Sequence, residues 1–342
     1  MTRVLSYNIL AGGMTPCAGE GRRTESLLRL ISAAQPDIIG LPEGLNPRRG
    51  TEKAVVEELA ERLEMTLLRG DHPTAGEEFQ VACLTRLPVL ASRVHVRPGV
   101  LTRPVLEVHV REEDGNELTV FVAHLLASFH KGRTAEQLRQ REIETILNIM
   151  AAVRGQPHLL MGDFNTLAPG EPLRASALLR YVLYLDQTLP DESQERDGHP
   201  HLAYVLPDRL RPLQPLLAHL LRNRLALWFI DALAGLSVPR KSIPLLQRAG
   251  YIDCFRHLHP REPGFTCPAL MPAGRIDFIF ASPELAPRLR VCQVVQEGNG
   301  ITGSQASDHL PVLAEFGPSA TPSPEKEPTQ TRPQALATLS LS

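Results

Sequence analysis

The stretch His158–Thr166, with the sequence HLLMGDFNT, joins a short apolar segment to a group of polar residues directly behind it. The run His158–Met161 has the length and apolar character of a buried β-strand. Asp163 and Asn165 follow its end, where a sheet presents side chains at its rim. A single Asp or Asn in such a place is most often a turn residue or a helix cap, so its meaning depends on the rest of the chain.

Apolar runs of the same kind recur along the chain and predict further strands, several of them alternating between apolar and polar residues. The predicted strands are Arg3–Ile9, Asp37–Leu41, Val81–Leu84, Val89–Val96, Val105–Val110, Leu118–Ala123, His158–Met161, Ile276–Phe280, Val291–Val295 and Pro311–Phe316. Patterns with apolar residues on one helical face lie between them, at Thr24–Ala34, Glu52–Leu63 and Thr134–Val153. This order of elements predicts a mixed α/β fold with largely antiparallel sheet.

Polar side chains lie at the ends of several predicted strands, where a sheet would bring them to a common rim. They are Asn8, Glu43, His124, Asp163, Asn165, Asp277, Asp308 and His309. The carboxylates offer oxygen ligands without a thiolate, which favours Mg²⁺ or Mn²⁺ over zinc, and histidines can act as acid or base at neutral pH. The sequence contains neither a G-x-S-x-G motif nor a P-loop. The set therefore indicates metal-assisted attack of water on a phosphoester.

Composition limits the compartment and the partners. The chain has 342 residues and a formal net charge of −2, which excludes binding of nucleic acid through bulk charge. Its five cysteines include no C-x-x-C pair, which argues against a disulfide framework and fits a reducing compartment. The start MTRVLSYNIL lacks the apolar core of a signal peptide, and no apolar stretch is long enough to span a bilayer. We therefore expect a cytoplasmic protein.

Six motifs occur in the order SYNIL, LPEG, HLLAS, GDFNT, RIDFIF and SDHLPV, and together they resemble the endonuclease/exonuclease/phosphatase superfamily. Its members include abasic-site DNA endonucleases, inositol polyphosphate 5-phosphatases, neutral sphingomyelinases and deadenylases. The resemblance implies one catalytic domain over residues 1–316. It implies a four-layer α/β sandwich of two mostly antiparallel β-sheets flanked by helices. The implied activity is Mg²⁺- or Mn²⁺-dependent hydrolysis of a phosphoester, with a phosphodiester favoured over a monoester.

The resemblance also implies a metal site. Glu43 would be the principal ligand, Asn8 would complete or support the site, and Asp308 would lie near it. The family usually has Gln just before this Glu, whereas the chain has Pro42, which affects only the surroundings of the ligand.

Catalytic roles are implied in the same way. His309 would contact the scissile phosphate and help to activate water, with Asp277 orienting its ring. Asp163 would position or deprotonate the water, and which of Asp163 and His309 is the formal base stays open. Asn165 would donate to a non-bridging oxygen, and His124 would donate to the charge that builds up in the transition state.

Two departures from the abasic endonucleases bear on the substrate. Those enzymes commonly have a carboxylate two residues after the first Asn and a Tyr at the position of His124, whereas this chain has Leu10 and His124. The departures favour the phosphatase and lipid phosphodiesterase branches. Lipid-linked phosphoesters, inositol phosphates and nucleic acid are therefore the substrate classes to test, and we expect a monomer.

Two segments differ in composition from the rest. An insert at about 183–243 contains the stretch LLAHLLRNRLALWFIDALAGL, whose part Leu225–Ile230 is apolar on every side. This predicts a buried helix, with a lid or a membrane-surface face over residues 213–236 as alternatives. Residues 317–342 are rich in Pro, Ser and Thr and predict a disordered tail.

Two other functions are compatible with parts of the sequence. An abasic-site or other DNA nuclease would use the same motifs and the large excess of Arg over Lys, but the near-zero net charge and the 5% aromatic content oppose it. A non-catalytic scaffold of the same fold is disfavoured because the metal carboxylate and the candidate acid–base groups are all present.

Overall fold

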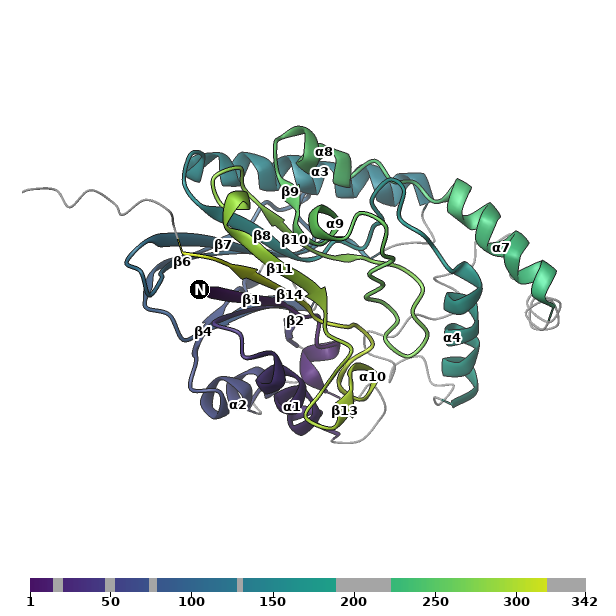
Figure 1. Ribbon diagram of the computed structural model, residues 1–342, viewed down its shortest axis with the longest axis horizontal. Helices are drawn as coiled ribbons and strands as arrows, with labels where there is room; N and C mark the ends of the chain where they lie inside the picture. The colour runs from purple at the N-terminus through teal and green to yellow at the C-terminus, as the bar shows by residue number, and fades with distance from the viewer. Residues whose placement is uncertain (15–20, 47–52, 74–78, 128–131, 189–222, 319–342) are drawn as a thin grey trace, which may run out of the picture.

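The computed structural model describes residues 1–14, 21–46, 53–73, 79–127, 132–188 and 223–318, which form two six-stranded sheets between layers of helices (Figure 1). The first sheet consists, in spatial order, of β11 (Leu289–Val294), β14 (Val312–Phe316), β1 (Thr2–Ser6), β2 (Ile38–Leu45), β4 (Gln80–Thr85) and β3 (Thr66–Arg69). The second consists of β5 (Val89–His95), β6 (Val105–Arg111), β7 (Glu117–His124), β8 (His158–Asp163), β10 (Asp277–Ala281) and β9 (Ile252–Asp253). A small hairpin joins β12 (Glu297–Gly298) and β13 (Ile301–Thr302).

Most neighbouring strands are antiparallel. Each six-stranded sheet has one parallel pair, β1 with β2 in the first and β7 with β8 in the second. This confirms the predicted α/β sandwich of mostly antiparallel sheets.

The central core lies between the two sheets. Because successive side chains of a strand point to opposite faces, every second residue of a strand enters this core. In β6, Leu106, Val108 and Val110 point into this core, whereas Val105 belongs to the apolar cluster on the outer face. Both faces of the sheets are therefore buried, which explains why several strands read as continuous apolar runs.

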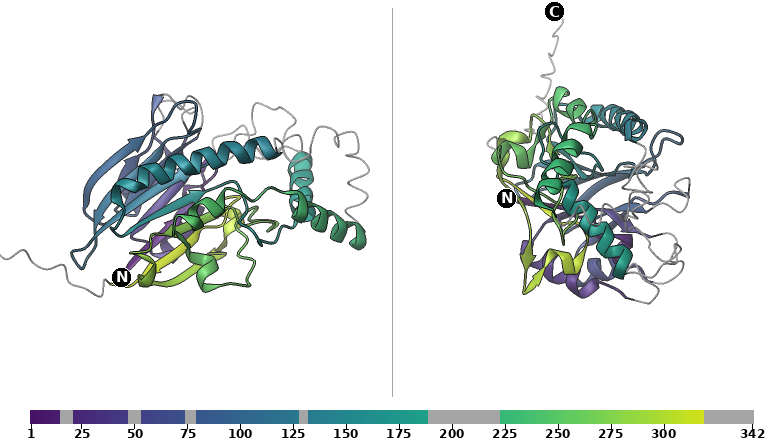
Figure 2. Two further views of the ribbon diagram at one scale, coloured as in Figure 1. Left: turned by 90° about the horizontal axis from the view of Figure 1, so that it is seen from above. Right: turned by 90° about the vertical axis from the view of Figure 1, so that its right-hand side faces the viewer.

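Helices cover the two outer faces (Figure 2). On the first sheet, α1 (Thr24–Ala34) and α2 (Val55–Arg62) pack their apolar sides against β1 and β2. On the second, α3 (Gly132–Met150) and α8 (Ile243–Arg248) do the same. At one end, α4 (Ala175–Thr188) and α7 (Arg224–Ser237) pack on each other. Shorter helical segments are η1 (Ala11–Gly13), η5 (Ala151–Val153), α9 (Cys254–Leu258), η7 (Ala286–Arg288) and α10 (Gly303–Ala306).

The predicted insert and tail are described only in part, because residues 189–222 and 319–342 lie outside the described ranges. Helix α7 forms within the predicted helical stretch, but none of its residues is buried, so the prediction of a buried helix is wrong. The helix packs one side on α4 and leaves its other apolar side exposed. In the described part of the chain, no helix combines the length and apolar character needed to cross a bilayer.

Candidate active site

The strand directions bring the predicted site residues to one edge of the sandwich. The parallel strands β1 and β2 end there, and β14 begins there because it is antiparallel to β1. The second sheet repeats this arrangement, with β7 and β8 ending where β10 begins. Asp163 pairs in register with His124 on one side and with Asp277 on the other.

Asn8 connects the two sheets at this edge. Its Nδ2 donates to Oε1 of Glu43 at 3.3 Å and to Oδ2 of Asp163 at 3.1 Å. Its Oδ1 accepts from the backbone N–H of Leu10 at 3.0 Å, while Oε2 of Glu43 accepts from the N–H of Ala11 at 2.9 Å. Asn8 thus presents its amide NH₂ rather than its oxygen to the carboxylates, which suits a supporting role better than direct ligation.

A second group surrounds His309. Its Nδ1 is 2.8 Å from Oδ2 of Asp277, and its Nε2 is 3.8 Å from Oδ2 of Asp163. All three side chains are buried, and ligand-capable atoms of the three lie within 4.8 Å of one another. The arrangement can move a proton, and it can also hold a cation.

His124 lies between the two groups. Its Nε2 is 3.6 Å from Oδ2 of Asp163 and 3.8 Å from Oε1 of Glu43. The backbone N–H of Asn165 donates to Oδ1 of Asp163 at 2.9 Å, and its side-chain Nδ2 donates to the carbonyl of Leu125 at 3.0 Å. In this conformation the Asn165 amide fixes the end of β7 to the end of β8.

Asp308 is the outlying member of the predicted set. It is half-buried next to His309, and its Oδ1 lies 3.4 Å from the hydroxyl of Ser307. Its negative charge is among the influences that raise the pKa of Glu43. Asp308 therefore acts on Glu43 through its negative charge, and in the described part of the chain no hydrogen bond joins the two side chains.

Burial separates the protonation states of these groups. It raises the pKa of Glu43, and it raises the pKa of Asp163 to about 7, with the neighbouring charge of Asp277 adding to the effect. Burial lowers the pKa of His124 well below its usual value, so this ring is neutral. Burial would also lower the pKa of His309, but surrounding negative charge, that of Asp277 foremost, holds it well above its usual value.

The donor set fits a hard divalent cation. Among the described residues, the ion-pair partners of Glu43 and Asp163 are His124 and His309, and the charges of Arg23 and Arg103 also act on Glu43. The two buried carboxylates lie on either side of the Asn8 amide, which donates to both. The Cys267 thiol is close to His309, and burial raises its pKa to about 12, so it is a neutral thiol in the metal-free protein. Oxygen donors with a residual negative charge favour Mg²⁺ or Mn²⁺.

Arg23 is a residue of this site that the sequence did not single out. Its Nη2 donates to the carbonyls of Ile9 and Leu10 at 2.7 and 2.6 Å, and its Nη1 donates to the carbonyl of Ala306. The guanidinium therefore joins the turn after Asn8 to the residue that precedes Ser307. No local signal marks it, because its partners are backbone carbonyls brought together only by the fold.

Replacing Arg23 by Met, which keeps much of the volume and removes the donors, is expected to weaken metal binding and lower kcat by about 10- to 100-fold, as loss of outer contacts of a metal site does. The measurement is titration with Mn²⁺ together with steady-state kinetics. Arg62→Met is the matched control, because Arg62 pairs with Glu25 at an exposed position on α2. Equal losses in both variants, or unchanged Mn²⁺ affinity in Arg23→Met, would contradict this role.

Asp163→Asn is expected to change the pH dependence of stability in the metal-free protein. The pKa of Asp163 in the folded chain, about 7, exceeds its ordinary value of 3.8. Between these values the folded state keeps a proton that the unfolded state gives up, so this carboxyl makes the protein less stable as the pH rises through the window. Asn does not titrate.

The difference in melting temperature, variant minus wild type, should therefore become more positive between about pH 5 and about pH 8 in the presence of a chelator. Thermal unfolding across this range checks it. A difference that stays constant or falls would contradict the buried, proton-retaining carboxyl.

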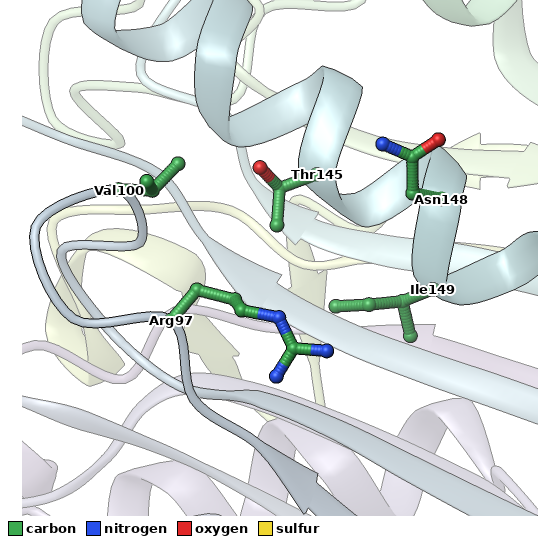
Figure 3. A pocket seen from close by; sticks show the side chains of 5 residues that line it. All are labelled: Arg97, Val100, Thr145, Asn148 and Ile149. Atoms are coloured by element: carbon green, nitrogen blue, oxygen red, sulfur yellow. The ribbon is translucent and has the colours of Figure 1, made fainter.

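A separate hollow of about 270 Å³ lies between the loop that follows β5 and helix α3. It is lined by Arg97, Val100, Thr145, Asn148 and Ile149, and Figure 3 shows the Arg97 side chain extending beneath α3 toward Ile149. The lining contains no carboxylate, imidazole or thiol. It therefore lacks the reactive groups of the edge around Glu43 and His309, which is the candidate active site.

The chain matches the Endonuclease/Exonuclease/phosphatase family over residues 5–309 and belongs to that family. No curated protein matches the sequence.

Solved structures of the same fold cover nearly all of the chain. An AP endonuclease from Archaeoglobus fulgidus has 15% identity and a TM-score of 0.54, with 92% of this chain and 99% of that chain covered. A 3'-5' exonuclease from Neisseria meningitidis has 18% identity and a TM-score of 0.51, with 92% and 100% covered. A conserved protein of unknown function from Enterococcus faecalis V583 has 16% identity and a TM-score of 0.58, with 93% and 100% covered. At these identities the likeness shows the fold.

Proposed function

We propose that the chain is a divalent-metal-dependent hydrolase that cleaves a phosphoester, with a phosphodiester favoured, through an activated water. Family membership supports a phosphoesterase in general. The observation that carries the finer proposal is the convergence of Glu43, Asp163 and the His309–Asp277 pair in one buried cluster whose pKa values are driven apart.

In this proposal Glu43 would hold Mg²⁺ or Mn²⁺, with Asn8 orienting the carboxylate and Asp308 adding negative charge. A bound cation would neutralise charge on the phosphate and lower the pKa of a coordinated water. The Asp163–Asp277–His309 group, whose ligand atoms are also close, is the alternative position for an ion.

The proton-transfer roles follow from the protonation states. Asp163, with a pKa of about 7, is suited to accept a proton from the attacking water. His309, with its raised pKa, is cationic and donates from Nε2 to a phosphate oxygen, while Asp277 fixes its ring through Nδ1. The water oxygen forms the new bond to phosphorus, the ester oxygen departs with the electron pair of the broken bond, and a proton from solvent neutralises it. Neutral His124 adds a hydrogen bond to the charge on the phosphate.

The test is a substrate screen with Mg²⁺ or Mn²⁺. We expect bis-p-nitrophenyl phosphate to be cleaved faster than p-nitrophenyl phosphate, and one of the lipid-linked, inositol phosphate or DNA substrates to be cleaved faster still. Folded protein without turnover in any divalent metal would favour the non-catalytic scaffold.

DNA cleavage is the second candidate. It is favoured by neighbours described as an AP endonuclease and as a 3'-5' exonuclease. The net charge of −2 and the replacement of the expected carboxylate by Leu10 oppose it. Incision of abasic duplex DNA in the same screen would decide in its favour. The cytoplasmic location and the monomeric state stay predictions.

A further inference from the structure

Helix α7 presents an apolar face that no described residue covers. Positions 225, 228, 229, 232, 233 and 236 lie on one side of the helix because an α-helix repeats every 3.6 residues. The large side chains among them are highly exposed, with 64% for Trp228, 65% for Phe229 and 88% for Leu236. None of these positions is charged. Exposed apolar surface of this kind marks a site of interaction.

The opposite side of α7 is fixed to the protein. Leu227 and Ile230 pack against Leu179 and Val182 of α4. Asp231, the only acidic residue of α7, accepts hydrogen bonds from the backbone N–H and the hydroxyl of Ser176 at 2.7 and 2.9 Å. The helix is therefore held in one orientation by its inner side, and its negative charge is directed toward α4.

The location of α7 relates this face to the candidate active site. Figure 1 and Figure 2 show α7 projecting beyond the two sheets, with α4 beside it. On α4, Tyr181 is buried, and the charges of Asp308 and His309 both act on its phenol. The α4–α7 pair thus forms part of the surroundings of the site while it carries the apolar face outward.

Charge and composition identify the occupant of this face. Arg224, the first residue of α7, is exposed next to Leu225 of this face, and Arg180 is exposed on α4; arginine suits lipid phosphates. Trp is enriched where a helix meets the headgroup region, and an apolar helical face flanked by basic residues binds anionic membrane surfaces. A second copy is a poorer fit, because a 14-residue helix is about 21 Å long and about 10 Å wide, well short of the ~800 Å² per partner in a stable interface.

We propose that the exposed face of α7 docks on the surface of a bilayer containing anionic lipids, with Trp228 and Phe229 entering the headgroup region. The helix lies on the membrane and does not span it. Docking needs no catalytic turnover, so the proposal stands or falls independently of the proposed function.

Trp228 provides a direct probe, because it is the only Trp of the chain. The full-length protein should show the emission of a solvent-exposed Trp, which shifts to shorter wavelength when vesicles of phosphatidylcholine and phosphatidylglycerol in equal parts are added. Pure phosphatidylcholine vesicles should give a smaller shift. Sedimentation of the same vesicles measures the bound fraction.

Leu236→Glu should lower the bound fraction at least about tenfold, because it places a charge on the C-terminal part of the apolar face while it disturbs no packed side chain, Leu236 being 88% exposed. Leu90→Glu is the matched control. Leu90 is also an exposed leucine, with 39% of its surface accessible, but it lies on β5, an edge strand of the second sheet, and not on α7. Equal binding by both variants would overturn the proposal. So would Trp emission that is already shielded in the free protein and unaffected by vesicles, or a shift that depends on protein concentration without vesicles, which would indicate a second copy.

Discussion

His309→Asn is expected to lower kcat for a phosphodiester about 1,000-fold while the fold and the KM change little, because the residue acts on the phosphate in the transition state. In the wild-type chain His309 is held between Asp277, 2.8 Å from Nδ1, and Asp163, 3.8 Å from Nε2. Asn can keep a hydrogen bond to Asp277, but it carries no charge. Steady-state kinetics at saturating Mn²⁺, with melting temperature as the check on folding, measures the effect.

His158→Asn is the matched control. His158 is also buried and lies at the start of β8, the strand that ends in Asp163, but it is 2.7 Å from both the carbonyl of Gln156 and the hydroxyl of Tyr251. Its loss should lower the melting temperature and leave kcat within about threefold of wild type, a free-energy difference below about 1 kcal/mol. A kcat of His309→Asn close to that of His158→Asn would contradict the catalytic role.

The sheets could be predicted because their strands are buried on both faces or alternate clearly. Every predicted strand has a counterpart, with ends that differ by a few residues, as between Arg3–Ile9 and the observed Thr2–Ser6. The sequence does not predict the edge strand β3. Its four residues TLLR are exposed or half-buried, and they form neither a continuous apolar run nor a regular alternation of apolar and polar residues. β9 has only two residues, too few for any periodicity.

The site could be predicted in outline, because its residues follow strand ends and form ordered motifs. Its details depend on contacts that sequence does not encode locally. The donation from the Asn8 amide to both carboxylates, and the closure of the site by Arg23, arise from residues far apart in the chain. The exposure of α7 could not be predicted for a similar reason. Its apolar composition indicates that the helix packs against another surface, but it does not show whether that surface belongs to the core of the same chain.

Glu43→Gln is expected to abolish both activity and the stabilisation of the protein by Mn²⁺. A cation that binds only the folded state stabilises it by about 2.7 kcal/mol at 100 times its dissociation constant. Gln keeps the shape and can still accept from the N–H of Ala11, but it removes the charge that a divalent ion requires. Activity should fall by at least about 1,000-fold, and the rise in melting temperature on adding Mn²⁺ should disappear.

Two further variants decide where the ion binds. Glu112→Gln removes a buried carboxylate that pairs with Arg288 and accepts from Thr2, at the opposite ends of the strands, so it should lower stability and keep the full Mn²⁺ effect. Asp277→Asn should also keep most of the Mn²⁺ effect, because its carboxylate is bonded to His309. If Asp277→Asn loses the effect and Glu43→Gln retains it, the cation is bound by Asp163, Asp277 and His309, and the assignment of Glu43 as principal ligand is wrong. A histidine that ligates a metal through Nε2 cannot also donate from that atom to phosphate, so an ion bound at Nε2 of His309 would be incompatible with the proposed role of His309 as proton donor.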